Sequence, residues 1–199
     1  MPTDGVRAVA GIVLAAGSST RMGRNKLLLP LDGESVLRRI VRRASDAKLD
    51  PLVVVLPPDS ARIVSELSGL PFQPAENRDP GRGQPSSLRV GIEALPAGVD
   101  AVVVLLGDMP LVTEAMIAAL VQHYCETGAP LVVSDYGGVA APPTLYGRVL
   151  FEELRAAAAH EGGRTVIARH REAAASVRWP PGGLADLDLP EDYARLSGS

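Results

Sequence analysis

The strongest constraint on the fold is a set of short apolar runs that alternate with helical patterns. The runs are rich in β-branched residues, are bounded by Gly, Pro or Asp, and lie at residues 8–15, 52–56, 101–106 and 131–133. They are apolar throughout, which is typical of parallel strands buried on both faces. Helical spacing predicts helices at residues 36–44, 60–67, 85–94, 113–125, 147–159 and 164–171. Such alternation predicts an α/β fold, with a mostly parallel sheet, right-handed crossovers and helices on both faces.

The length of 199 residues suffices for one apolar core, and we expect a single domain over residues 1–199. Hydrophobic residues make up 46% and charged residues 22%, which argues against disordered and coiled-coil chains. The Gly/Pro clusters are too short to link domains, so we interpret them as loops at residues 78–85, 137–143 and 180–183. Residues 184–189 are predicted to return to the sheet.

Charge and cysteine content exclude several classes of partner. Twenty basic and 23 acidic residues give a net charge of −3, which argues against a general nucleic-acid binder. The single cysteine, Cys125, cannot form an internal disulfide, and the three histidines have no zinc-ligand spacing. No signal-peptide pattern opens the chain, and no apolar run reaches the roughly 18–20 residues that span a bilayer. We therefore expect a cytoplasmic protein with neither nucleic-acid nor membrane partners.

The first predicted strand leads into a glycine-punctuated loop with three cations, LAAGSSTRMGRNK at residues 14–26. Glycine lets backbone N–H groups approach phosphate oxygens, and the side chains of Arg21 and Lys26 can neutralise the phosphate charge. The spacing matches neither the Walker A loop nor the GxGxxG fingerprint. Glycine content alone also fits a tight turn with solvated arginines.

The whole string resembles the signature LAAGxSxRMGxxK of the MobA-like nucleotidyltransferases, and within them it is most similar to the molybdenum cofactor cytidylyltransferases. The resemblance extends over most of the chain, through residues 25–28, 83–88, 106–110 and 186–193. It implies a Rossmann-like three-layer sandwich of the nucleotide-diphospho-sugar transferase type. It also implies an Mg²⁺-dependent enzyme that transfers CMP from CTP to a molybdopterin-type cofactor and releases pyrophosphate.

The resemblance assigns roles to individual residues. It implies that Arg21, Lys26 and Asp108 are catalytic. The nucleotide would be bound by Leu14, Ala15, Ala16, Gly17, Ser18, Arg21, Lys26, Ser86 and Ser87. The metal ligands would be Asp108 and Asp188, with Asp186 ranked behind them.

Asp108 can also be argued from its position. It follows the apolar run 101–106, so it lies at the carboxyl end of a predicted strand, where ligands gather in open α/β sheets. Magnesium is commonly held by one or two carboxylates together with substrate phosphates and water. A turn residue before Pro110 is the other interpretation of Asp108, and an acidic loop is the other interpretation of Asp186 and Asp188.

Two positions bear on substrate identity. Pro142 stands where the cytidylyltransferases have the histidine of a Gly-His-Pro segment, which leaves the acceptor open. Ala16 favours cytidylyl transfer, because the guanylyl subgroup resembles LAGG there. The other hypotheses are a guanylyl or other NTP transferase acting on a small phosphorylated acceptor, and a non-catalytic maturation factor that binds nucleotide or molybdopterin. A transient contact with a molybdoenzyme or its maturation factor would suit either class.

Two further cationic positions stay outside the predicted site. The arginines opposite the apolar stripe of the 36–44 helix are interpreted as a solvated face: Arg38, Arg39, Arg42 and Arg43. Arg164 is equally consistent with contact to an anionic acceptor and with a capped turn.

Overall fold

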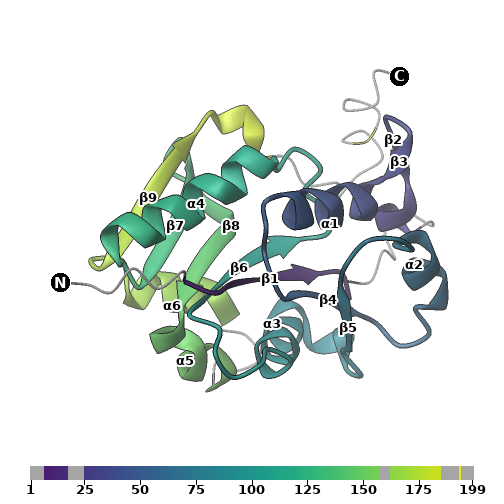
Figure 1. Cartoon of the computed structure of the whole chain (residues 1–199), viewed down its shortest axis with the longest axis horizontal. Helices are drawn as coiled ribbons and strands as arrows, with labels where there is room; N and C mark the ends of the chain where they lie inside the picture. Colours follow the sequence, from purple (N-terminus) through teal and green to yellow (C-terminus); the bar gives the residue numbers. More distant parts are fainter. Residues whose placement is uncertain (1–6, 18–24, 157–161, 185–192, 194–199) are drawn as a thin grey trace.

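A central sheet forms the frame of the molecule. The structure is a computed structural model that describes residues 7–17, 25–156, 162–184 and 193. In this part of the chain, seven strands form one sheet in the order β5-β4-β1-β6-β8-β7-β9 (Figure 1). The strands are β1 (Val9–Leu14), β4 (Leu52–Leu56), β5 (Gln73–Glu76), β6 (Ala101–Leu106), β7 (Leu131–Tyr136), β8 (Ala140–Gly147) and β9 (Ala174–Trp179). Strand β8 is antiparallel to both of its neighbours, and the other pairings are parallel.

Helices cover both faces of the sheet (Figure 1). One core lies under α1 (Val36–Asp46), α2 (Ala61–Glu66) and α4 (Glu114–Thr127). The other lies under α3 (Gln84–Glu93), α5 (Phe151–Ala156) and α6 (Gly162–Arg169). Alternate residues of β1 divide between the two cores, with Val13 in the first and Ile12 in the second. The strand is therefore buried on both faces, which explains why it is apolar throughout. The fold is the predicted α/β Rossmann-like sandwich.

Short elements complete the described structure. A two-stranded hairpin is formed by β2 (Pro30–Leu31) and β3 (Glu34–Ser35) and leads directly into α1. Single 3₁₀ turns occur at η2 (Lys26–Leu28), η3 (Pro80–Arg82), η4 (Arg148–Leu150) and η5 (Pro181–Gly183). In the ranges that the structure describes, no helix combines the length and the apolar character needed to cross a bilayer.

The predicted strands and helices are confirmed apart from their ends, with one clear exception. The predicted helix at 147–159 is shorter, because η4 precedes α5, which begins at Phe151. Of the predicted return to the sheet, Leu184 follows η5 and the remaining residues lie outside the described ranges.

The loop predicted at residues 137–143 is wrong from Ala140 onward, where β8 begins. Its register against β7 is regular up to Val133↔Thr144, is interrupted, and resumes at Ser134↔Ala141. The interruption skips two prolines, which have no N–H to donate to a ladder. Side chains bind their carbonyl oxygens instead: Ser134 Oγ donates to Pro143 O (2.7 Å), and Tyr136 Oη donates to Pro142 O (3.1 Å).

The arginine face of α1 is not simply solvated, so that prediction is wrong. Each guanidinium ties the helix to another segment. Arg38 donates to the carbonyl oxygens of Glu66 and Ser68, and Arg43 to those of Pro110 and Val112. The other two reach the hairpin through Arg39–Leu31, Arg39–Asp32 and Arg42–Glu34. Because these groups are already bound, they do not form an anion-binding patch.

Candidate active site

The carboxyl ends of β1 and β6 bring together the predicted motifs at residues 14–26 and 106–110. The strands pair in parallel up to Leu14↔Leu106, and Gly107 N then donates to Leu14 O (3.0 Å). A Cβ on Gly107 would stand 3.0 Å from Leu37 Cδ1 and 3.2 Å from Leu14 O. The absence of a side chain thus lets the turn after β6 close over the end of β1, which places Asp108 beside the loop that follows β1.

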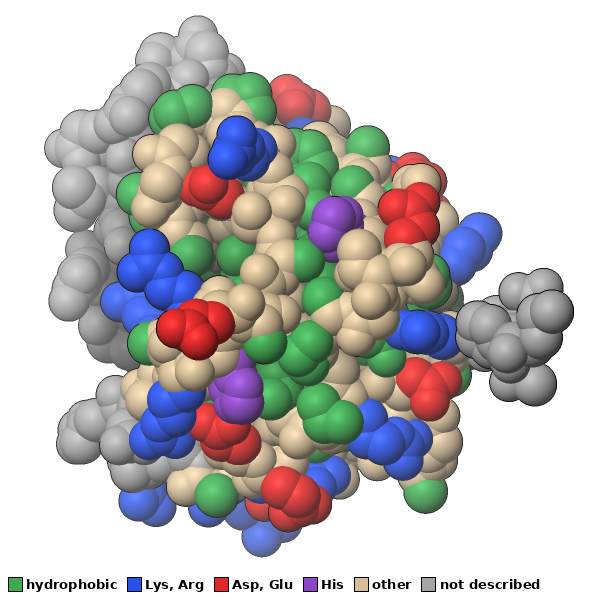
Figure 2. Space-filling model, turned by 90° about the vertical axis from the view of Figure 1, so that its left-hand side faces the viewer, with side chains coloured by type: hydrophobic (Ala, Val, Ile, Leu, Met, Phe, Trp, Pro, Cys, Tyr) green, Lys and Arg blue, Asp and Glu red, His purple; other side chains and the backbone are tan. Residues whose placement is uncertain are grey.

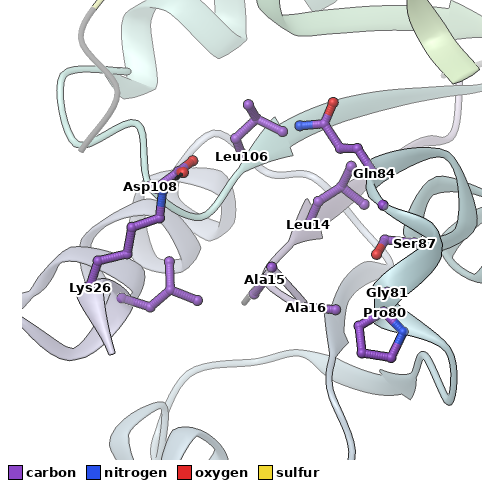
Figure 3. A pocket seen from close by; sticks show the side chains of 13 residues that line it. Leu14, Ala15, Ala16, Lys26, Pro80, Gly81, Gln84, Ser87, Leu106 and Asp108 are labelled. Atoms are coloured by element: carbon purple, nitrogen blue, oxygen red, sulfur yellow. Dashed lines mark ion pairs between the residues drawn. The ribbon is translucent and has the colours of Figure 1, made fainter. Parts of the chain in front are cut away.

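A pocket of about 330 Å³ opens at this edge of the sheet. Figure 3 shows Lys26 and Asp108 on one side of it, the segment from Pro80 to Ser87 on the other, and the end of β1 between them. Its lining residues are Leu14, Ala15, Ala16, Gly17, Lys26, Leu27, Pro80, Gly81, Gly83, Gln84, Ser87, Leu106 and Asp108. The pocket lies where ligands bind in open α/β sheets, outside the carboxyl ends of the strands.

Lys26 and Asp108 form an ion pair on one wall. Lys26 Nζ lies 2.6 Å from Asp108 Oδ2, and the two side chains are 16% and 21% exposed. Lys26 opens the 3₁₀ turn η2, where the Asn25 side chain accepts a hydrogen bond from Leu27 N (3.1 Å). The pair joins the loop after β1 to the loop after β6. It offers a cation for a phosphate and a carboxylate for a metal ion at one place.

The opposite wall is held by Asn77, which is only 2% exposed. Its Nδ2 donates to Ser86 Oγ and to Ser87 Oγ, both at 2.9 Å, and its Oδ1 accepts from Asp79 N (3.0 Å). Ser86 Oγ in turn donates to Gly83 O (2.8 Å). Gly83 has a φ of +80°, a conformation that side chains rarely tolerate. Asn77 therefore fixes the turn η3 and the start of α3 as one unit.

The structure brings most of the predicted site residues together. The pocket is lined by Leu14, Ala15, Ala16, Gly17, Lys26, Ser87 and Asp108. Ser86 does not line it, since its hydroxyl is used within the loop. Ser18, Arg21, Asp186 and Asp188 lie outside the described residues.

Sequence reasoning did not assign Asn77 or the lining residues Leu27, Pro80, Gly81, Gly83, Gln84 and Leu106. Four of these, Leu27, Gly83, Gln84 and Leu106, stand in matched motifs, so the resemblance held a signal for them. Asn77 carries no such signal, because its role depends on a contact with residues nine and ten positions further along the chain.

The donor set suits a magnesium ion that shares its ligands with a substrate. Within the described ranges, no group of three or more His, Cys, Asp or Glu side chains could hold a metal ion. Among the described residues that line the pocket, Asp108 is the one carboxylate. Magnesium usually takes one or two carboxylates plus phosphate oxygens, so Asp108 fits such an ion when a nucleotide supplies the phosphates.

A pocket at the carboxyl edge of an α/β sheet, lined by a backbone loop, a lysine and a carboxylate, is the arrangement expected of a protein that binds a nucleotide through its phosphates. The sequence profile of the MobA-like NTP transferase domain matches residues 11–174. The chain therefore belongs to the MobA-like NTP transferase family.

Relatives match the chain over nearly its whole length. The purine catabolism protein PucB of Bacillus subtilis is 33% identical over 195 residues, covering 92% of this chain and 93% of that protein. The molybdenum cofactor guanylyltransferase of Rhodobacter capsulatus is 30% identical over 190 residues, covering 94% of each. The crystal structure of Rv0371c from Mycobacterium tuberculosis superposes with a TM-score of 0.82 at 26% identity, covering 98% of this chain and 100% of that one. A manganese complex of the same protein superposes with a TM-score of 0.75 at 25% identity, covering 96% and 99%.

Proposed function

We propose that this NTP transferase moves CMP from CTP to the phosphate of a molybdopterin-type acceptor, releases pyrophosphate and uses Mg²⁺. The observation that carries the proposal is the Lys26–Asp108 pair at the edge of the pocket, opposite Ser87. The manganese complex of Rv0371c supports a divalent ion at such a site. A cytoplasmic location and a single domain over residues 1–199 complete the proposal.

The chain's own residues bind and position the reactants. An oxygen of the acceptor phosphate attacks the α-phosphorus, a new P–O bond forms, and the bond to the β-phosphate breaks so that pyrophosphate leaves. Lys26 and Arg21 neutralise charge on the phosphates, and the backbone of residues 14–17 holds them. The attacking phosphate is already an anion, so no general base is needed. Mg²⁺, when bound, stabilises charge on the phosphates.

Asp108 holds the metal ion in this proposal, together with Asp188. Two described residues support the choice of Asp188, because they flank its segment. Leu184 lines a second pocket that Asp108 also lines. Tyr193 donates from Oη to Pro30 O, two residues after η2 ends.

The choice of CTP rests on Ala16, which is buried in the pocket lining. Its methyl group leaves less room than the glycine of the guanylyl pattern, which favours the smaller pyrimidine base. A guanylyltransferase among the relatives makes GTP the main competitor. ATP and UTP are included because the family as a whole is described only as NTP transferases.

Thermal stability measured with CTP, GTP, ATP and UTP, each with and without Mg²⁺, tests the nucleotide. A ligand at about 100 times its Kd stabilises a protein by about 2.7 kcal/mol, which at this chain length raises Tm by roughly 5–10 °C. We expect the largest shift with CTP and Mg²⁺. A larger shift with GTP would reject cytidylyl transfer in favour of guanylyl transfer, and a larger shift with UTP or ATP would select the corresponding transferase.

Asp108→Asn separates an enzyme from a nucleotide-binding maturation factor. Pyrophosphate release with CTP, Mg²⁺ and molybdopterin is expected from the wild type and should fall by about 10² or more in the variant. Asp46→Asn, on the outer end of α1, is the matched control and should release pyrophosphate normally. Nucleotide binding without any release from the wild type would favour the maturation factor.

A further inference from the structure

Helix α1 supports the turns on both sides of the ion pair in the candidate site. Val36, its first residue, donates from N to Leu29 O (3.0 Å), and Leu29 N donates to Lys26 O (3.3 Å). The Leu37 side chain reaches the turn after β6, where a Cβ on Gly107 would stand 3.0 Å from Leu37 Cδ1. One helix therefore packs against the turn that carries the lysine and against the turn that carries the carboxylate.

Arg43 ties the loop between β6 and α4 to this helix. Arg43 Nη1 donates to Pro110 O (2.7 Å) and to Val112 O (2.6 Å). Asp108 lies in the same loop, two residues before Pro110. Within the loop, Val112 N donates to Met109 O (3.2 Å), and Pro110 has no N–H to donate. The two bonds from Arg43 therefore help to fix the path of the chain directly after Asp108.

An arginine at this position has an electrostatic cost. Burial, together with the charges of Arg39 and Arg42 on the same helix, lowers the pKa of Arg43 below its ordinary value. The two carbonyl oxygens offset this cost, because hydrogen bonds from a charged donor are stronger than those from a neutral one. The guanidinium of Arg43 is thus bound to the loop and is not a free surface cation.

We propose that Arg43 is a positioning residue for the reaction: by binding the carbonyl oxygens of Pro110 and Val112, it fixes the loop that presents Asp108 to the metal ion. This inference rests on the proposed function, in which Asp108 holds Mg²⁺. Arg43 itself touches neither the nucleotide pocket nor the ion pair, so its effect passes through the loop.

The chain offers a matched control on the same helix. Arg38 Nη1 also donates to two carbonyl oxygens, those of Glu66 (2.6 Å) and Ser68 (3.1 Å). These lie at the end of α2, and α1 lies between α2 and α4 on one face of the sheet (Figure 1). The two arginines therefore make the same kind of contact in opposite directions. Of the two segments that they hold, the one bound by Arg43 carries a residue of the candidate site.

Arg43→Met and Arg38→Met keep most of the apolar stem of the side chain and remove the donors. Each leaves two carbonyl oxygens without their partner, so both should lose a similar amount of thermal stability, roughly 2–8 °C in Tm. Hydrogen exchange followed by mass spectrometry shows which segment loosens. We expect faster exchange over residues 107–113 in Arg43→Met, and over residues 66–70 in Arg38→Met.

Calorimetry with CTP measures what the loosened loop does to the metal site. The ratio of the Kd in EDTA to the Kd with Mg²⁺ is the gain in affinity that the metal ion supplies. We expect Arg43→Met to reduce this gain at least about fivefold and Arg38→Met to leave it within about twofold. Removing a positive charge would by itself favour a nearby cation, so a smaller gain reports a displaced carboxylate. GTP replaces CTP if the thermal comparison selects it.

The outcomes separate the inference from the proposed function. An equal metal gain in Arg43→Met and Arg38→Met, or unchanged exchange over residues 107–113 in Arg43→Met, would overturn the positioning role. Wild-type protein that binds neither nucleotide better with Mg²⁺ would reject the metal role of Asp108, and with it both proposals. A normal metal gain in the wild type without pyrophosphate release would reject the transferase alone, and the comparison of the two arginine variants would still decide the role of Arg43.

Discussion

Gly17 ends the described segment after β1, and no atom of the described residues lies within 4 Å of the position that a Cβ would take there. Its φ is not in the left-handed region, so a side chain is compatible with the backbone. Packing among the described residues therefore does not require glycine at this position. The space that glycine leaves on this side is available to a ligand.

Gly17→Val should accordingly separate stability from binding. We expect the free energy of unfolding in urea to change by no more than about 0.5 kcal/mol, as at other open surface positions. The affinity for CTP with Mg²⁺, measured by calorimetry, should fall at least about tenfold, because the side chain enters the space of the phosphates. Unchanged affinity would remove residues 14–17 from the phosphate site.

Lys26 is expected to act mainly in the transition state. Removing one preorganised charge partner of a transition state often costs about 10² to 10³ in kcat. We predict a loss of this size for Lys26→Met in the pyrophosphate-release assay. Lys48→Met, in the turn after α1, is the matched control and should keep full activity. Unchanged turnover of Lys26→Met would reject the phosphate role of Lys26.

At the residue level, the sequence could reveal those site residues that stand in local strings. Asp108 could be predicted because it comes two residues after an apolar strand. Lys26 could be predicted because it ends the glycine loop that follows another apolar strand. Their contact at 2.6 Å could be inferred only from the parallel pairing of β1 and β6. Asn77 could not be predicted, since its buried amide contacts two hydroxyl groups on another element.

At the scale of elements, Asn77 links the end of β5 to the start of α3. Asn77→Ala removes the donor to two buried hydroxyl groups, so we expect a loss of about 1–3 kcal/mol of unfolding free energy. The wall formed by η3 and Ser87 should loosen, and the KM for CTP should rise more than kcat falls. Arg78→Ala, the exposed neighbour, is the control for both measurements. A stable variant with normal KM would show that the wall is held without Asn77.

The strands that sequence reasoning missed lack a continuous apolar run, either because they lie at an edge of the sheet or because they contain prolines. Strand β5 reads Gln-Pro-Ala-Glu and lies at one edge of the sheet, so it needs no continuous apolar run. Strand β9 lies at the other edge and is only partly buried. Strand β8 contains two prolines that an interrupted register accommodates. The buried parallel strands β1, β4 and β6 were predictable because both of their faces pack against helices.

At the scale of the whole molecule, the 20 basic and 23 acidic residues nearly balance. Figure 2 shows the face at the left of Figure 1, where acidic and basic side chains are interspersed and hydrophobic side chains lie between them. With a net charge of −3, such a surface gives no broad field that would attract a polyanion. The charged groups form local contacts. Among the ion pairs described above, those between α1 and the hairpin lie closest together.

The acid stability of the molecule should depend on one of these contacts. Glu34, on β3, accepts hydrogen bonds from Arg42 at 2.7 and 3.1 Å and is 17% exposed. The Arg42 hydrogen bonds lower the pKa of Glu34 below its ordinary value of 4.5, against the opposing effect of burial. A carboxyl whose pKa is lower in the folded state contributes stability above its unfolded pKa. That contribution is lost as pH falls through the folded pKa.

Glu34→Gln should therefore lower the free energy of unfolding by about 1 kcal/mol at pH 7, a modest value because Arg42 is partly exposed. The difference from wild type should shrink progressively as the pH falls below 4.5, since protonated glutamic acid and glutamine are then alike. Urea denaturation at several pH values between 7 and 3 measures this difference. Glu172→Gln, at an exposed turn, should differ little from wild type throughout. A Glu34→Gln difference that stayed constant with pH would mean that packing, and not the charge on Glu34, joins the hairpin to α1.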